Sequence, residues 1–186
     1  MRPEYRLHWV ARANLETLFP NLSNSHWQIR SPIDKSYNCF AWAACDTTVR
    51  WEPSPDNYWP EGVSREYGLE SFIQGFSVLG YAACDNTAYE FGFQKVAIYS
   101  ELYMGEEWPT HMARQDIFRR GWLSKLGDFE DILHPNLSDL EGSSYGRVVR
   151  VLKRSWLTAI VNFCALKSAW ASFRHWLYRR RRPQGV

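Results

Sequence analysis

The stretch QKVAIY at residues 94–99 decides the fold class, because its Val, Ile and Tyr side chains favour β-strands. Two further β-like segments follow it, HMARQ at residues 111–115 and GWLSKL at residues 121–126. The links between the three segments carry glycine and proline, which are typical of turns. We therefore expect an antiparallel meander in the middle of the chain.

Helical patterns precede these strands. Residues 65–79 place apolar side chains at the i, i+3, i+4 and i+7 positions of an amphipathic helix, and Gly80 supplies its stop. A shorter apolar segment at residues 38–46 predicts a second helix, and residues 14–18 predict a third. Helices followed by a meander indicate an α+β fold, with N-terminal helices packed on a small antiparallel sheet.

The composition predicts one globular domain followed by a basic tail. Of the 186 residues, 45% are hydrophobic and 16% are aromatic, which is ample for a packed core. Six of the 22 basic residues and none of the 20 acidic residues fall within residues 155–186. We therefore divide the chain into an α+β domain at residues 1–154 and an apolar, basic C-terminal helix and tail at residues 155–186.

The tail has two interpretations. Residues 156–178 are mainly apolar and aromatic, and four arginines follow at residues 179–182. Lys167 in the centre makes a bilayer crossing costly, so residues 156–182 would either adsorb to an anionic membrane surface or dock on the domain. Nucleic-acid binding is not favoured, because the rest of the chain is not basic. No signal-peptide pattern opens the sequence, so we expect a cytoplasmic protein, peripheral to the membrane if the tail adsorbs.

One segment suggests nucleophilic chemistry. The run YNCFAWA at residues 37–43 places Cys39 at the first turn of a short helix, where a thiol loses its proton more easily. His111 opens the strand at residues 111–115 and is the candidate general base. The alternatives are a buried structural cysteine and a core or surface histidine.

A third group would have to orient the imidazole of His111. The hairpin register puts Ser124 and Gln115 on the face of His111, while Asp128 and Asp131 lie just beyond the strand. Asp128 leads, because a carboxylate is the usual orienting group. All four side chains are equally open to interpretation as structural or solvated turn residues.

Aromatic and polar side chains flank this site in the sequence. We expect Asn38, Trp42, Tyr58 and Trp59 to line a substrate groove. The four cysteines and five histidines show no local metal-ligand spacing, and no phosphate-binding glycine loop occurs. We therefore expect no cofactor.

Several short sequence blocks together resemble an uncharacterised bacterial domain family over about residues 20–154. The blocks are YNCxAWA (37–43), HxARQ (111–115), SKLG (124–127), DIxH (131–134) and LEG (140–142). More distantly, the chain is similar to papain-like cysteine hydrolases such as the NlpC-type and CHAP amidases. In those enzymes a helical cysteine precedes a small sheet whose first strand opens with the catalytic histidine. Lys95 holds that place here, so the resemblance implies either a transglutaminase-like order with His111 as base or no catalysis.

Two functions follow from these observations. The first is a cysteine hydrolase or acyltransferase acting on an amide or ester bond of a peptide-like or acyl substrate through Cys39 and His111. The second is a non-catalytic binding module on the same scaffold, of the toxin-associated or immunity type.

Overall fold

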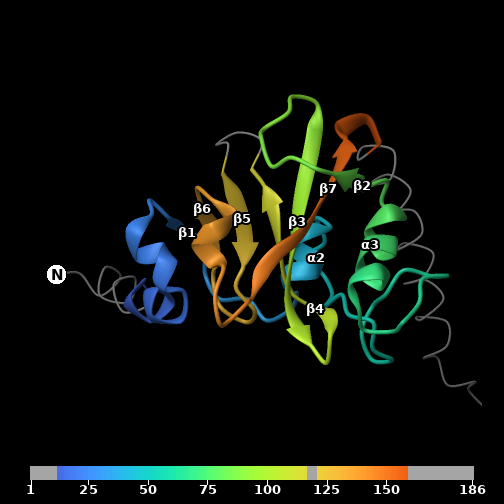
Figure 1. Cartoon of the computed structure of the whole chain (residues 1–186), viewed down its shortest axis with the longest axis horizontal. Helices are drawn as coiled ribbons and strands as arrows, with labels where there is room; N and C mark the ends of the chain where they lie inside the picture. Colours follow the sequence, from blue (N-terminus) through green and yellow to red (C-terminus); the bar gives the residue numbers. More distant parts are fainter. Residues whose placement is uncertain (1–11, 117–120, 159–186) are drawn as a thin grey trace, which may run out of the picture.

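The computed structural model describes residues 12–116 and 121–158, which form a seven-stranded antiparallel sheet with short helices around it (Figure 1). The strand order is β1-β6-β5-β4-β3-β7-β2. The α+β class is confirmed, but the prediction of a small sheet is wrong because four further strands join the meander. The strands are β1 (Gln28–Ser31), β2 (Ala82–Cys84), β3 (Phe93–Tyr103), β4 (Glu106–Gln115), β5 (Trp122–Lys125), β6 (Asp131–His134) and β7 (Arg147–Ser155).

The helices are short. α2 (Cys39–Ala43) and α3 (Leu69–Ser77) lie between β1 and β2, while residues 12–18 are helical and lead into the 3-10 turn η1 (Pro20–Asn24). A second 3-10 turn, η2 (Leu137–Leu140), follows β6. Gly80 has φ +84° and ends the α3 segment as the sequence predicts. The predicted helix at residues 38–46 is shorter than expected, because Cys45 has φ +68° and leaves the helical conformation.

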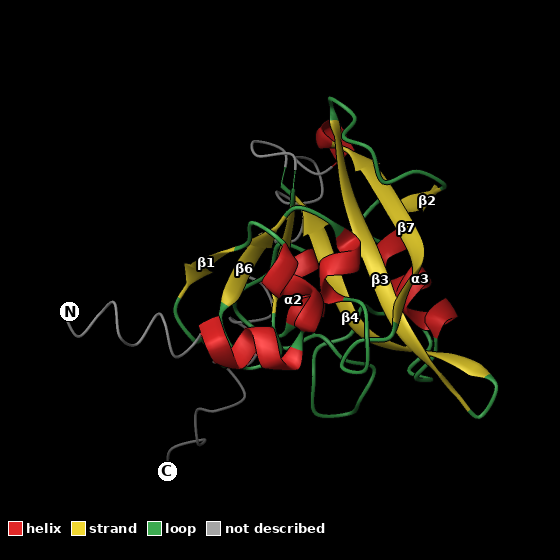
Figure 2. Ribbon diagram, turned by 60° about the vertical axis from the view of Figure 1, so that its left-hand side comes forward, coloured by secondary structure: helices red, strands yellow, loops and turns green. Residues whose placement is uncertain are grey.

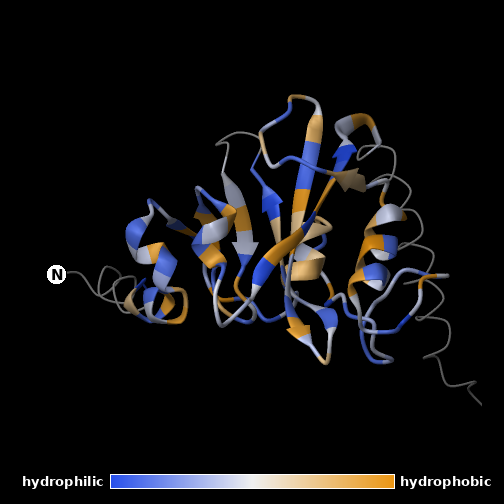
Figure 3. Ribbon diagram, in the orientation of Figure 1, coloured by the Kyte–Doolittle hydropathy of each residue, from blue (hydrophilic) through white to orange (hydrophobic). Residues whose placement is uncertain are grey.

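The sheet separates two hydrophobic clusters. α2 and α3 cover what we call the helix face, and Phe40 and Phe72 are buried there. The N-terminal segment and η2 cover the opposite side, which we call the N-terminal face, and Leu22 is buried there. Strand residues alternate between the two clusters: Ile98 belongs to the helix face and Tyr99 to the N-terminal face. Hydrophobic and hydrophilic residues accordingly occur along the same strands (Figure 3).

The hairpin of β3 and β4 extends beyond the rest of the sheet (Figure 2). β3 pairs with β7 only as far as Ser100, and β4 pairs with β5 only from Ala113 onward. Within the described strands, residues 101–103 and 106–108 therefore pair with each other alone. We call residues 101–108 the arm.

Among the described residues, no helix has the length and apolar character needed to cross a bilayer. The predicted C-terminal helix and tail begin inside the structure with a helical turn at residues 156–158. The rest of the segment at residues 156–182 lies outside the described residues.

Candidate functional site

Cys39 occupies the start of α2, as the sequence predicts, but it is buried there. The N-cap residue Asn38 accepts a hydrogen bond from the Ala41 N–H at 3.1 Å, which fixes the first turn. Cys39 is only 6% exposed. Burial raises the pKa of the Cys39 thiol to about 11, and the Met112 N–H of β4 offsets this only in part. Desolvation at Cys39 therefore opposes the effect of the helix start, and the activated thiol stays a prediction.

His111 is a buried neutral side chain on the N-terminal face. Its ring stacks on Tyr145 at a centroid distance of 4.1 Å and meets the edge of Tyr99 at 5.3 Å. Burial, together with the nearby His134, holds the pKa of His111 well below its ordinary value. Neither ring nitrogen has a hydrogen-bond partner among the described residues. The imidazole is thus an aromatic core residue in its uncharged form.

The structure does not bring Cys39 and His111 together. The Cys39 side chain belongs to the helix-face cluster with Met112, the strand residue after His111. The His111 ring contacts Tyr99 and Tyr145, which belong to the cluster of the N-terminal face. Because neighbouring strand residues point to opposite faces, the backbone of β4 lies between the predicted nucleophile and its predicted base.

The predicted register around Ser124 is confirmed, but Ser124 forms its hydrogen bond with His134 and not with His111. Ser124 pairs with Ala113 across β4 and β5 and shares the face of His111. Its Oγ lies 2.9 Å from Nε2 of His134, whose Nδ1 lies 2.8 Å from the carbonyl of Asn136. A carbonyl only accepts, so Nδ1 carries the proton and Nε2 accepts from Ser124. His134 is the last residue of β6.

This Ser124–His134 pair has the geometry of a hydrolase dyad but lacks access. Both residues are 0% exposed, and burial lowers the pKa of His134 to about 4. The Asp139 carboxylate, 4.0 Å from Nδ1, instead accepts the backbone N–H of Asn136 at 2.9 Å. The pair therefore anchors η2 to the sheet, and the block DIxH was the sequence signal that could have revealed it.

The other predicted orienting groups have separate partners. Asp128 is exposed and forms an ion pair with Arg50 at 2.9 Å. Asp131 accepts a hydrogen bond from Tyr37 at 2.9 Å on the helix face, which raises the pKa of Tyr37, already raised by burial, to about 12. Gln115 shares the face of His111, but its amide donates to the carbonyl of Thr87 at 2.8 Å. Asp128 and Asp131 are thus not positioned to orient the imidazole.

Lys95 occupies the strand position at which papain-like hydrolases carry a histidine, and it is fully buried. Its Nζ donates to Oδ1 of Asn86 at 2.6 Å and to the carbonyl of Ala88 at 2.7 Å, and lies 3.5 Å from Glu90. Lys95 lies on the same face as Tyr99, because the two are four residues apart on β3. The ammonium group therefore holds the loop before β3 and lies away from Cys39.

The predicted groove residues pack largely as core. Asn38 caps α2, and Trp59 is 4% exposed and packs under Gly75 of α3. Tyr58 is half-buried against Trp51, with ring centroids 4.8 Å apart. Trp42 lies beneath the guanidinium of Arg114, 4.4 Å from the ring centroid. These contacts stabilise the helix face and its rim.

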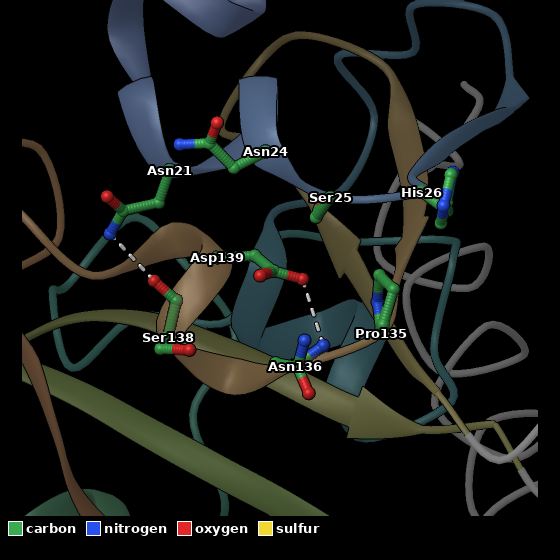
Figure 4. Close-up of a pocket in the computed structure, with 8 residues that line it drawn as sticks. All are labelled: Asn21, Asn24, Ser25, His26, Pro135, Asn136, Ser138 and Asp139. Atoms are coloured by element: carbon green, nitrogen blue, oxygen red, sulfur yellow. Dashed lines mark hydrogen bonds between the residues drawn. The ribbon is translucent and has the colours of Figure 1, made fainter.

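A shallow polar recess of about 530 Å³ lies elsewhere, between the N-terminal segment and η2 (Figure 4). Asn21 reaches across it and donates to the carbonyls of Ser138 at 2.9 Å and Glu141 at 3.1 Å. On the other side Asp139 is tied to Asn136. These groups form hydrogen bonds with one another. The recess therefore marks the contact that holds the N-terminal segment on the rest of the domain. The lining residues are Asn21, Asn24, Ser25, His26, Pro135, Asn136, Ser138 and Asp139.

Within the described parts of the chain, no group of three His, Cys, Asp or Glu side chains is arranged to hold a metal ion. Comparison with curated proteins and with solved structures finds no significant match. One family model does match, over residues 28–153, which run from the start of β1 into β7 and include both sequence blocks around Cys39 and His111. The chain therefore belongs to the family described as Domain of unknown function (DUF7689).

Proposed function

We propose that this protein is a protein-interaction module and not a Cys39–His111 hydrolase. The order of a cysteine-bearing helix followed by an antiparallel sheet is consistent with a papain-like scaffold that has no working catalytic pair. The buried, protonated Cys39 and the neutral His111 on the other face support this interpretation. The observation that carries the proposal is the arm, which presents apolar side chains to solvent.

The arm is unusually apolar for a projecting hairpin. Leu102 is 70% exposed, Tyr103 is 54% exposed and Met104 is 88% exposed. A two-stranded ribbon is only marginally stable in water, so such side chains do little for the fold. Clustered exposed apolar residues of this kind mark interaction sites.

The turn of the arm favours the same interpretation. Met104 has φ +51° and Gly105 has φ +87°, as in the two-residue hairpin turns that prefer Asn-Gly or Gly-Gly. An unbranched but bulky methionine at positive φ is uncommon and strained. A strained, exposed apolar residue at the tip of a projecting hairpin suits contact with a partner better than it suits stability.

The base of the arm is rigidly held. Trp108 stacks on Tyr67 at a centroid distance of 4.4 Å, and the Tyr67 hydroxyl donates to the carbonyl of Pro109 at 3.0 Å. Glu107 on the other side bonds Ser100 and pairs with Arg147. The tip is therefore presented on a fixed support, which lowers the entropy lost on binding.

The charges of the arm indicate the chemistry of the partner. Glu101 and Glu106 are exposed beside the apolar tip, and residues 101–108 contain no basic side chain. This combination suits a protein surface with an apolar pocket rimmed by lysine and arginine, and it disfavours an anionic membrane surface. A toxin-associated or immunity-type partner of this character is consistent with the proposal.

Cross-linking followed by titration tests the proposal. A photo-reactive amino acid at position 102 should give a discrete cross-linked product in the cells that produce the protein. The second protein in that product is the partner. The purified partner should then bind the double variant Leu102→Ser/Met104→Asn at least about tenfold more weakly than wild type. Phe91→Ser is the matched control, because Phe91 is 80% exposed but lies away from the arm.

Two results would overturn the proposal. One is unchanged affinity of the double variant when its fold is intact. The other is hydrolysis of an ester or amide substrate that disappears in both Cys39→Ala and His111→Ala while the folds of these variants persist, because that result would restore the hydrolase.

A further inference from the structure

A second cysteine lies in quite different surroundings. Cys45 follows α2 at the surface, and its Sγ lies 3.0 Å from Nη1 of Arg114 and 3.6 Å from Nη2 of Arg154. The strand register explains the cluster, since Gln94 of β3 pairs with Arg154 of β7, and Val96 pairs with Arg114 of β4. Three neighbouring strands thus direct Gln94, Arg114 and Arg154 to the helix face, where α2 ends.

The groups facing the sulfur are hydrogen-bond donors. Oε1 of Gln94 already accepts from the Tyr81 hydroxyl at 2.9 Å and from Arg154 at 2.9 Å and 3.2 Å. Oε1 lies 3.8 Å and Nε2 lies 3.7 Å from Sγ, and because Oε1 already has these donors, Nε2 is the group available to Cys45. Two guanidinium groups and one amide N–H group donate toward the sulfur atom. A thiolate accepts such hydrogen bonds more strongly than a thiol does.

The charges around Cys45 also favour an anion there, and this argument does not depend on the hydrogen bonds to the sulfur. Arg154 is only 6% exposed, and buried charges in proteins are normally paired. Among the described residues, no carboxylate lies within 4.0 Å of either Arg114 or Arg154. The nearby Tyr81 cannot supply the anion, because burial raises its pKa well above the ordinary value. An anion at Cys45 would offset one of the two positive charges at this site.

Neighbouring groups hold the cluster in place. The Arg114 guanidinium lies over the Trp42 ring and donates to the Trp42 carbonyl at 2.9 Å, and Arg154 lies over the Tyr81 ring at 4.5 Å. The adjacent carboxylate of Asp46 turns away and accepts from the Trp51 indole at 3.0 Å.

We propose that Cys45 is a modification site: an exposed cysteine between Arg114 and Arg154 that hydroperoxides oxidise to a sulfenic acid. The sulfur lone pair attacks one peroxide oxygen, an S–O bond forms and the O–O bond breaks. With hydrogen peroxide, the thiolate and the peroxide give the sulfenic acid and hydroxide, so sulfur loses two electrons and the peroxide gains them. The guanidinium groups then contact the nascent anion as the O–O bond breaks.

Cys84 provides an internal comparison. It is partly exposed, but its Sγ donates to the carbonyl of Asn86 at 3.3 Å, and no guanidinium group is recorded beside it among the described residues. Cys39 is buried among apolar side chains. The structure therefore ranks Cys45 as the most oxidisable of these three thiols.

The full chain treated with hydrogen peroxide at pH 7, with dimedone as the sulfenic-acid trap, tests the proposal by peptide mass spectrometry. Cys45 should be trapped at least about tenfold faster than Cys84. Arg114→Gln should slow trapping at Cys45 about fivefold or more, while Arg114→Lys, which keeps the charge, should retain most of the rate. Cys84 should react equally in all three proteins.

Equal trapping of Cys45 and Cys84 in the wild-type protein overturns the proposal without any variant. So does an Arg114→Gln protein of native circular dichroism that reacts at Cys45 as fast as wild type, because exposure alone would then explain the reactivity.

Discussion

The side-chain amide of Asn38 forms two hydrogen bonds with the backbone of Trp51. Nδ2 of Asn38 donates to the Trp51 carbonyl at 2.8 Å, and its Oδ1 accepts the Trp51 N–H at 3.1 Å. The same oxygen caps α2 through Ala41. One buried side chain thus fastens the loop after α2 to the start of that helix.

Replacing Asn38 with alanine should therefore be strongly destabilising. The change removes three hydrogen bonds and leaves buried backbone groups of Trp51 unpaired, at a cost of about 2–4 kcal/mol in the free energy of unfolding. Urea denaturation measures it. Asn24→Ala, at an exposed position, should stay within about 0.5 kcal/mol of wild type. A loss below that value at Asn38 would contradict the role assigned to this residue.

The buried histidines should make the protein sensitive to acid. The pKa of His134 falls from the ordinary 6.5 to about 4, and that of His111 is also lowered. The unfolded chain therefore binds more protons below pH 6.5, and stability should decline from pH 6.5 toward pH 4. His134 alone would account for roughly 3 kcal/mol over this range.

Denaturation midpoints at pH 7, 5.5 and 4.5 measure the effect. His111→Phe should make the decline shallower and leave stability at pH 7 unchanged or higher, because the unpaired ring nitrogens are removed. His26→Gln, at an exposed position, should leave the slope unchanged. A wild-type protein equally stable at pH 7 and pH 4.5 would show that these imidazoles are not buried as neutral groups.

Two glycines with similar backbone angles should respond very differently to alanine. Gly146 has φ +70°, and a Cβ there would lie 2.0 Å from the carbonyl oxygen of Ser100, whereas Gly92 has φ +86° and open space around it. Gly92→Ala should cost about 1–2 kcal/mol for the left-handed conformation alone. Gly146→Ala should cost several kcal/mol more, or fail to fold. Similar losses in thermal melts would exclude the close contact between β7 and β3.

The buried Cys39 thiol should escape labelling in the native protein. Iodoacetamide at pH 8 should modify Cys45 and Cys84 and leave Cys39 unmodified until urea unfolds the chain, because burial raises the pKa of Cys39 to about 11. Peptide mapping before and after denaturation measures this. Rapid native labelling of Cys39 would indicate that α2 opens readily.

A substitution that relieves the strain in the turn of the arm should stabilise the protein. Met104→Asn replaces a bulky residue at φ +51° with one that tolerates this conformation, so it should raise stability by about 0.5–1 kcal/mol. Leu102→Ser, on an exposed strand position, should change stability little. A lower melting temperature for Met104→Asn would mean that the methionine packs on something in the native state.

The sequence predicts the α+β class, the α3 segment and three of the strands because these carry strong local patterns. QKVAIY is rich in β-formers, and the periodicity around Phe72 and Phe76 matches a helix packed on one side. The remaining strands are short or mixed in character. β7, for example, carries Arg147, Arg150 and Lys153 among its apolar residues, and only its pairing with β3 explains the extended conformation.

The candidate site is harder to predict because it depends on which face a side chain occupies. The position of Cys39 at a helix start and the pairing of Ala113 with Ser124 follow from local rules. The side of the sheet on which α2 packs does not follow from local rules, and it places His111 away from Cys39. Likewise, the sequence around Cys45 does not predict its contact with Arg154, which lies 109 residues further along the chain.

The family match begins at residue 28, yet the N-terminal face is completed by Leu15, Phe19 and Leu22, which lie before it. A fragment limited to residues 28–153 would keep η2 but would lose these three side chains from the cover of Tyr99 and Ile132. The segment that the family model matches is therefore smaller than the unit that folds in this chain. In this chain the segment before residue 28 therefore supplies part of the core, so its removal should expose apolar surface and favour self-association.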